Sequence, residues 1–128
     1  MIKINRTIFI IGIIFVILLS ILFTIIDNKH IGRLNREYNK NITDAENINS
    51  KIIKVEEWHG VSNITLDNGD KYFLVGADNY SYSKVDLFDY LVVGNKIVKK
   101  KGIDSLWVET PEGRFVFIVG ESINRDKK

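Results

Sequence analysis

The segment Glu56-Glu57-Trp58-His59 contains the residue types closest to those of a reactive site. In an extended strand alternate side chains share a face, so Glu57 and His59 could offer a carboxylate and an imidazole to one metal ion. A zinc site takes at least three protein ligands, and His30, the only other histidine, lies in a different segment. The sequence therefore predicts neither a metal site nor an acid–base pair here, and no cofactor is expected.

Aspartates are frequent, but their spacing is that of turns. Asp67-Asn68-Gly69-Asp70 lacks the carboxylate spacing and the terminal Glu of a calcium-binding EF-hand loop, so weak calcium binding is only an alternative to turn formation. The chain has no Gly-x-Ser-x-Gly elbow, no phosphate-binding loop, no dinucleotide fingerprint and no cysteine. The sequence does not predict an enzyme.

Aromatic residues supply the candidate binding surface. Small barrels bind oligosaccharides or nucleic acids on one face, and we expect Trp58, Tyr80 and Tyr82 to form a surface for a ligand or partner. Tyr80 and Tyr82 should be the most exposed of the aromatic residues because they lie in a polar loop, while core packing accounts for most of the others. Residues 51–120 carry 9 basic and 10 acidic side chains, which argues against nucleic acid as the partner.

Short β-rich runs separated by turn signals must position these aromatic residues. Asn68-Gly69 readily supplies the positive φ angles of a tight hairpin, and Ser83-Lys84-Val85-Asp86 resembles a capping box that could begin a short helical turn. The pattern predicts a small all-β domain of about six antiparallel strands, an SH3-like or OB-like barrel. The expected strands are Ile52–His59, Val61–Leu66, Lys71–Val75, Lys96–Lys100, Leu106–Glu109 and Arg114–Val119.

Two features of the later strands carry further expectations. The run from Phe115 to Val119 is apolar on both faces, which is typical of a strand that is central in its sheet or covered by a partner. Lys99-Lys100-Lys101 is expected to be solvated at a hairpin.

The segment Thr7–Ile26 is of a different kind, with 16 apolar residues in 20 and no charge, Asn, Gln or Pro. As a helix it spans about 30 Å, the hydrocarbon thickness of a bilayer. It predicts a single transmembrane helix. The net charge of +2 lies in Lys3 and Arg6, because the chain from residue 27 onward carries 16 basic and 16 acidic side chains.

A retained anchor is favoured over a cleaved signal peptide, because the run is longer than a signal h-region and no small-residue cleavage site follows it. Four basic residues follow the apolar run, against Lys3 and Arg6 before it, and by the positive-inside rule this count would place the C-terminal domain in the cytoplasm. The four are Lys29, Arg33, Arg36 and Lys40. We nevertheless expect this domain outside the cytoplasm, since the N-terminal tail has no acid and Asp27 adjoins the far end of the span.

The expected organisation has five parts. A connector between the span and the β domain has apolar residues at spacings of three or four, a weak helical stripe that predicts a partly helical spacer, with a coiled coil as the alternative. The parts are a basic tail at 1–6, the transmembrane helix at 7–26, the polar connector at 27–50, the β domain at 51–120 and a polar tail at 121–128.

Part of the β domain resembles a known pattern. Asn68-Gly69-Asp70-Lys71-Tyr72, the run from Tyr90 to Lys101 and Ser105-Leu106-Trp107-Val108 are similar to a pattern in small membrane-anchored proteins of Bacteroidetes with a C-terminal β domain. This chain has Asn95 and Val98 where the pattern more often has Asp and Ser. The resemblance implies architecture and a bacterial origin but no chemistry.

The expected function is therefore binding. We expect a single-pass protein held in the cell membrane by Thr7–Ile26, whose β domain serves as a protein-interaction or accessory module of the bacterial envelope. The alternative is a module that binds cell-wall glycan or peptide.

Overall fold

The computed structural model describes residue 3 and residues 5–127. The chain divides into two compact units, Met1–Arg36 and Glu37–Lys128. The first contains nearly all of one long helix, and the second is built around a β-sheet. The predicted fold class, an N-terminal apolar helix and a small all-β domain, is confirmed.

The helix α1 (Arg6–Glu37) contains the whole predicted span and continues beyond it. Its large apolar side chains between Ile8 and Ile26 are all exposed, from 38% at Leu19 to 67% at Phe23. The hydroxyls of Ser20 and Thr24 each donate to the carbonyl oxygen four residues earlier, at 2.9 Å, so both are satisfied without water. The helix is long and apolar enough to cross a membrane.

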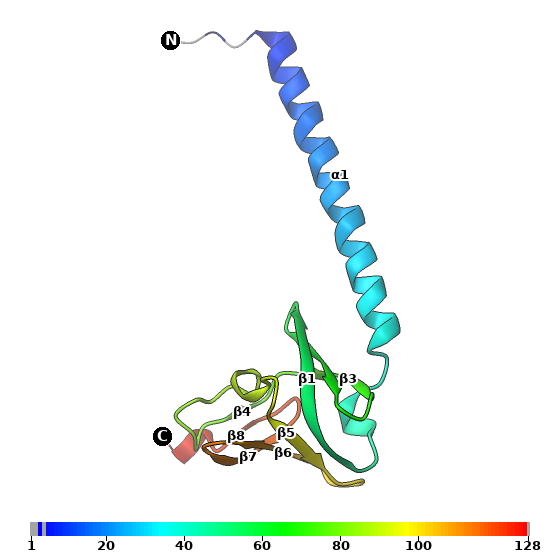
Figure 1. Cartoon of the computed structure of the whole chain (residues 1–128). Helices are drawn as coiled ribbons and strands as arrows, with labels where there is room; N and C mark the ends of the chain where they lie inside the picture. The colour runs from blue at the N-terminus through cyan, green and yellow to red at the C-terminus, as the bar shows by residue number, and fades with distance from the viewer. Residues whose placement is uncertain (1–2, 4, 128) are drawn as a thin grey trace. The chain divides into compact units, whose positions relative to one another are not determined.

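The β domain contains one six-stranded antiparallel sheet in the order β3-β2-β1-β5-β6-β7 (Figure 1). Its strands are β1 (Ile48–Trp58), β2 (Val61–Leu66), β3 (Lys71–Val75), β5 (Lys96–Lys99), β6 (Ser105–Thr110) and β7 (Gly113–Ile118). A separate parallel pair joins β4 (Asp78–Asn79) to β8 (Ser122–Ile123), and three short 3-10 helices are η1 (Ile42–Asp44), η2 (Leu87–Tyr90) and η3 (Arg125–Lys127).

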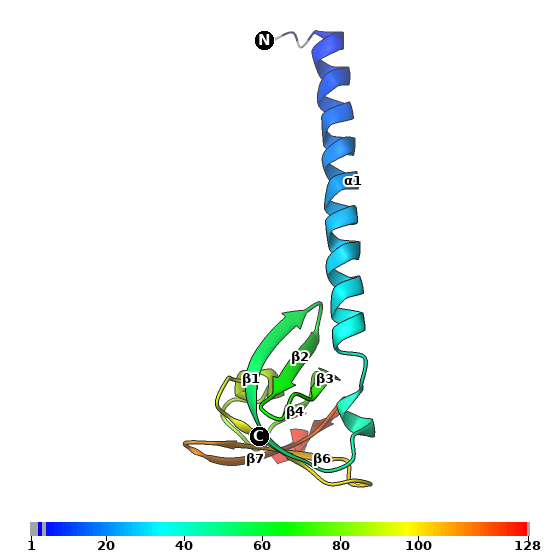
Figure 2. The ribbon, with the colours of Figure 1, turned by 45° about the vertical axis from the view of Figure 1, so that its right-hand side comes forward.

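The sheet curls but does not form the closed barrel that the strand count suggested. Residues 48–51 of β1 pair with β5 and residues 52–58 pair with β2, so two ladders share this long curved strand (Figure 2). In the part of the chain that the structure describes, β3 and β7 are the sheet's edges and no ladder joins them. The segments after these strands meet: the N–H of Gly120 donates to the Gly76 carbonyl oxygen at 3.0 Å, and β4 pairs with β8.

The core lies on the concave side of the curl, where strands β3, β5 and β6 alternate between buried and partly exposed residues. Its fully buried members include Ile64, Leu74, Ile97, Leu106 and Phe117, each at 0% exposure. Burying side chains of this size contributes about 1.5–3 kcal/mol each, so the sheet's inner face supplies the domain's stability.

Strand β7 is at an edge of the sheet, yet its edge is covered by the chain itself. The N–H of Val116 donates to the hydroxyl of Tyr82 at 2.9 Å, and the carbonyl oxygen of Val116 accepts from the amide of Asn79 at 2.9 Å. The central position expected for this apolar strand is therefore wrong. The cover comes from the segment around residues 79–82, which hides the backbone groups of an otherwise open edge.

The β domain begins earlier than the sequence suggested, because the second half of the predicted connector belongs to it. Tyr38, Ile42 and Ile48 are 2%, 0% and 4% exposed. The Tyr38 hydroxyl lies 3.2 Å from the Glu56 carboxylate and 3.1 Å from the Thr65 hydroxyl. The predicted connector is partly helical, as expected, because α1 continues through it to Glu37 and η1 follows at Ile42–Asp44. Tyr38 and Ile48 of its apolar stripe are buried outside these helices.

The lysine run after β5 also differs from the expectation of a solvated hairpin. Lys99 is only 3% exposed, and its ammonium donates to the Ala45 carbonyl oxygen at 3.3 Å. Lys101 is exposed and forms an ion pair with Glu46 at 3.1 Å. These two lysines tie the start of the domain to the β5–β6 hairpin.

Candidate functional site

Trp58, the first predicted site residue, lies at the end of β1 and is partly buried. It pairs with Val61 across the β1–β2 hairpin, and its ring meets that of His59 edge to face at 4.7 Å. His59 and Gly60 have φ angles of 48° and 78°, which form the two-residue turn. The strand expected to include His59 therefore ends one residue earlier.

Because β1 ends at Trp58, Glu57 and His59 do not have the arrangement that was considered for metal binding. Glu57 is exposed on β1, whereas His59 belongs to the turn, so they are not alternate residues of one strand. Over residue 3 and residues 5–127, no group of three His, Cys, Asp or Glu side chains is placed to hold a metal ion.

Tyr80, the second predicted site residue, directly follows β4 and is half-buried. Its N–H donates to the Ile123 carbonyl oxygen at 3.0 Å, which extends the β4–β8 pairing by one residue. The guanidinium of Arg125 lies 5.5 Å from the centre of its ring, within the range of a cation–π contact.

Tyr82, the third predicted site residue, belongs to a packed aromatic cluster that we define as Tyr82, Tyr90, Phe115 and Phe117. Its ring meets that of Phe115 at 4.9 Å and 86°, and the rings of Tyr90 and Phe115 are 4.6 Å apart. Its hydroxyl accepts the Val116 hydrogen bond described above. Tyr82 is thus partly buried and structural, which differs from the exposure expected of a polar loop.

The three predicted residues do not form one surface along the sheet. Trp58 lies on the β1–β2 hairpin, whereas Tyr82 contacts β7, the last strand at one edge of the order. Tyr80 is joined to β8. Tyr80 and Tyr82 are therefore both held by the C-terminal part of the domain, and Trp58 belongs to another part.

An open depression of about 630 Å³ lies beside the aromatic cluster, and sequence reasoning missed it. We call it the Val93 depression. Val92 and Val93 line it and are 52% and 59% exposed, although both are β-branched apolar residues. Other lining residues are Ser83, Lys84, Asp89, Tyr90, Asn95, Thr110, Pro111, Glu112 and Phe115.

A tight backbone turn explains why these valines point outward. The Gly94 N–H donates to the Ile52 carbonyl oxygen at 2.9 Å, the Asn95 N–H donates to the Val92 carbonyl oxygen at 3.0 Å, and Gly94 has a φ of 97°. The backbone is thus tied to the sheet while Val92 and Val93 stay exposed. The only sequence signal was an apolar pair directly before a glycine in a turn.

Charged residues line the Val93 depression together with its apolar side chains. Lys84, Asp89 and Glu112 line it with Tyr90, whose hydroxyl donates to the Lys84 carbonyl oxygen at 2.7 Å. Burial raises the pKa of Tyr90, and the nearby Tyr82, Asp89 and Glu112 raise it further. The phenol therefore stays protonated at neutral pH, and the depression is suited to an apolar side chain with polar neighbours.

A second hollow, of about 530 Å³, is polar and lies beside η1. Asp44, Glu46, Asp70 and Tyr72 line it with several asparagines. Burial raises the pKa of Tyr72, and Asp70 raises it further. Hydrogen bonds within the turn, such as Asp70 N–H to the Asn68 side-chain oxygen at 2.9 Å, account for much of its polarity.

We take the Val93 depression as the candidate site on the β domain because it exposes two apolar side chains, and none of the three predicted residues lines it. Comparison with known proteins adds nothing to its assignment. No family model, no curated protein and no solved structure matches the chain.

Proposed function

We propose that this chain is a single-pass membrane protein that acts as an accessory module of the bacterial envelope, with a β domain that binds another envelope protein. The observation that carries the proposal is the surface of α1, where every large apolar side chain from Ile8 to Ile26 is exposed. Exposing such an apolar surface to water costs free energy, whereas burying it in the hydrocarbon core of a bilayer does not. Insertion of its 16 apolar residues would contribute on the order of −5 to −10 kcal/mol.

The helix supports a retained anchor. It runs without interruption from Arg6 to Glu37, past the end of the apolar run at Ile26. We propose that the β domain lies outside the cytoplasm. A reporter that is active only outside the cytoplasm, fused to the C-terminus, should be active, and a well-expressed but inactive fusion would reverse this orientation.

The Val93 depression supports partner binding by the β domain. Its lining combines exposed apolar side chains with charged ones, and protein interfaces also combine apolar and charged residues. Its small size suits a weak or transient contact. The resemblance to membrane-anchored Bacteroidetes proteins is the reason for placing the partner in a bacterial envelope.

Site-specific photocrosslinking in native membranes tests this proposal. A photoreactive amino acid at Val93 should capture one reproducible envelope protein, identified by mass spectrometry. The matched control is Ile103, which is 48% exposed in the turn between β5 and β6. Capture of the same proteins from both positions would count against the Val93 depression as the interface.

The alternative function, a module for cell-wall glycan or peptide, is favoured by the half-buried rings of Trp58 and Tyr80, since partly exposed aromatic rings can stack on sugars. Titration of the isotope-labelled β domain with soluble wall fragments separates the two functions. Chemical-shift changes at Trp58, Tyr80 and Tyr82 would favour the glycan or peptide module. No change with wall fragments, together with crosslinking at Val93, would favour the protein partner.

A further inference from the structure

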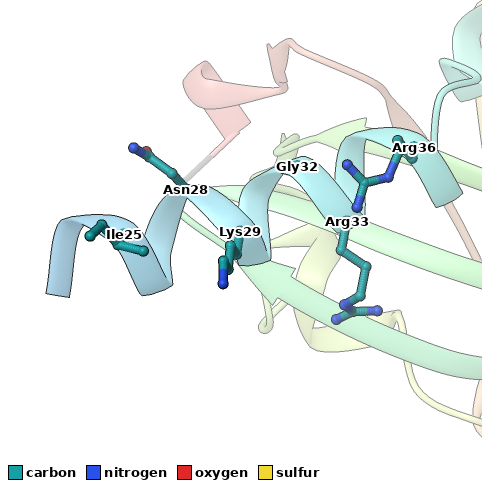
Figure 3. A pocket seen from close by; sticks show the side chains of 6 residues that line it. All are labelled: Ile25, Asn28, Lys29, Gly32, Arg33 and Arg36. Carbon is teal, nitrogen blue, oxygen red and sulfur yellow. The ribbon is translucent and has the colours of Figure 1, made fainter. Parts of the chain in front are cut away.

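Helix α1 carries a basic face directly after its apolar run. Lys29, Arg33 and Arg36 are spaced by four and three residues, which places them on one side of the helix. They line a shallow groove of about 670 Å³ on this side (Figure 3). The other lining residues are Ile25, Asn28 and Gly32.

Helix α1 has two acids, Asp27 and Glu37. Glu37 follows Arg33 by four residues, which places it beside the basic face, and its carboxylate forms an ion pair with Lys71 at 4.0 Å. Asp27 is two residues before Lys29, a rotation of about 200° around the axis, so its carboxylate emerges opposite the basic face. Among the residues that the structure describes, those lining the groove include the three basic residues and no carboxylate. The groove therefore presents three cations on one side.

Gly32 gives the groove its shape. A Cβ atom on Gly32 would lie 3.4 Å from Nη1 of Arg36, so the guanidinium rests against the helix where a larger residue would interfere. Figure 3 shows the Arg36 side chain turned back toward Gly32, and Lys29 and Arg33 extending from the helix. This follows the general tilt of helical side chains toward the N-terminus. It moves the Arg36 charge toward the apolar run.

We propose that this basic face binds the phosphates of anionic phospholipid headgroups, an inference that rests on the proposed membrane anchoring. Lys29 lies about 4.5 Å beyond Ile26 along the axis and Arg36 about 15 Å beyond it. The headgroup layer is only about 5–8 Å thick on each side of the bilayer. Lys29 thus reaches this layer directly, and the fold of Arg36 over Gly32 brings its guanidinium closer to it.

The chemistry of the side chains matches this occupant. A guanidinium presents paired N–H donors that can bind a phosphate bidentately, and a lysine adds a point charge. A headgroup is favoured over free phosphate because the basic face continues directly from the apolar surface of the same helix.

Spin-label electron paramagnetic resonance on the full chain tests the proposal. The protein is reconstituted into phosphatidylcholine vesicles with 20 mol% phosphatidylglycerol, and the association of spin-labelled phosphatidylglycerol is compared with that of spin-labelled phosphatidylcholine. We expect a preference for phosphatidylglycerol on the order of tenfold, which falls as salt rises. Equal association of the two lipids with the inserted wild-type protein would overturn the proposal.

Variants assign the preference to the groove. The triple variant Lys29→Gln, Arg33→Gln, Arg36→Gln should lose the preference for phosphatidylglycerol. The control Lys51→Gln, Lys54→Gln, Lys100→Gln removes the same charge from exposed sites of the β domain and should keep this preference. The variant Gly32→Leu retains every charge, but it should lose part of the preference for phosphatidylglycerol because the Arg36 side chain must move. Equal loss in the two triple variants would contradict the assignment.

Two further outcomes separate the possible failures. Inorganic phosphate at matched ionic strength should leave the lipid preference unchanged, and its abolition would show that the groove takes free phosphate instead. Wild-type protein that fails to sediment with pure phosphatidylcholine vesicles would refute the membrane anchoring itself. Insertion without lipid preference would refute only the headgroup site.

Discussion

The apolar residues of α1 and those of the β domain are of the same types, but their surroundings are opposite. Ile17 on the helix is 53% exposed, whereas Ile64 in the sheet is at 0%. The sheet buries its apolar face by curling, and the connector and the segment around residues 79–82 cover its margins. The helix surface has no such cover along its apolar run. The sheet therefore buries its apolar face within its own domain, whereas the helix exposes a surface that is long and apolar enough to cross a membrane.

The largest expected effect is the loss of membrane association when charged residues are placed in the apolar run of α1. The double variant Ile14→Lys, Ile17→Lys replaces two favourable residues by two unfavourable ones near the centre of the span, a cost of about 6–8 kcal/mol. We expect it to leave the membrane pellet after alkaline carbonate extraction, with the β domain still folded. The same substitution at Ile53, which is exposed on β1, should have no effect on extraction and serves as the control.

The start of the β domain can be tested with two fragments. Residues 37–128 should fold in water, whereas residues 51–128 should not, because they lack Tyr38, Ile42 and Ile48. These buried side chains contribute on the order of 5–8 kcal/mol together, which is comparable to the whole stability of a small domain. Circular dichroism melting distinguishes them, and a cooperative transition in the shorter fragment would contradict the boundary at Glu37.

Removal of a core ring should have a smaller but clear effect. Phe117→Ala in the 37–128 fragment should cost about 3–5 kcal/mol and lower the melting temperature by more than about 12 °C. Val93→Ala removes an exposed side chain and should change stability by less than about 0.5 kcal/mol. A shift of only a degree or two for Phe117→Ala would show that the aromatic cluster is not part of the core.

The smallest predicted effect concerns the protonation of Tyr90. Its pKa in the fold is above the unfolded value near 10, so the stability it contributes is present below pH 10 and is lost as the pH rises through the folded pKa. Tyr90→Phe loses the hydrogen bond to Lys84, about 1 kcal/mol at neutral pH, but also escapes this alkaline loss. The difference in free energy of unfolding between the wild type and Tyr90→Phe should therefore be smaller above pH 10 than at pH 7, as measured by urea unfolding. An equal difference at both pH values would contradict the burial of the phenol.

The elements with strong local signals were predictable from the sequence. Strands β2 and β3 begin and end where the alternating pattern predicted, since Asn68 and Gly69 fix the turn between them, with a φ of 92° at Gly69. The apolar helix was predictable because 16 of the 20 residues from Thr7 to Ile26 are apolar and the run contains no proline. Asp86 caps η2 by accepting from the Phe88 N–H at 2.9 Å, so the helical turn that the Ser83–Asp86 pattern suggested begins only at Leu87, after the last residue of that pattern.

The features that the sequence did not predict depend on long-range contacts. Lys99 is buried because a carbonyl oxygen 54 residues away meets its ammonium, and Tyr82 is packed because β7 offers Val116 to its hydroxyl. Local polarity suggested exposure at both. The Val93 depression could not be predicted either, because valines in a strand-rich sequence are expected in the core. Periodicity along the chain does not contain such information.

Amide hydrogen exchange on the full chain in lipid nanodiscs tests the central claim most directly, because it compares the two regions in one sample. The amides of residues 8–26 should be protected for hours in the bilayer. The amides of the β domain core should be equally protected in the nanodisc and in the 37–128 fragment without lipid. Exchange of residues 8–26 in nanodiscs as fast as that of the exposed turn at residues 67–69 would show that water reaches the helix, and would contradict the account.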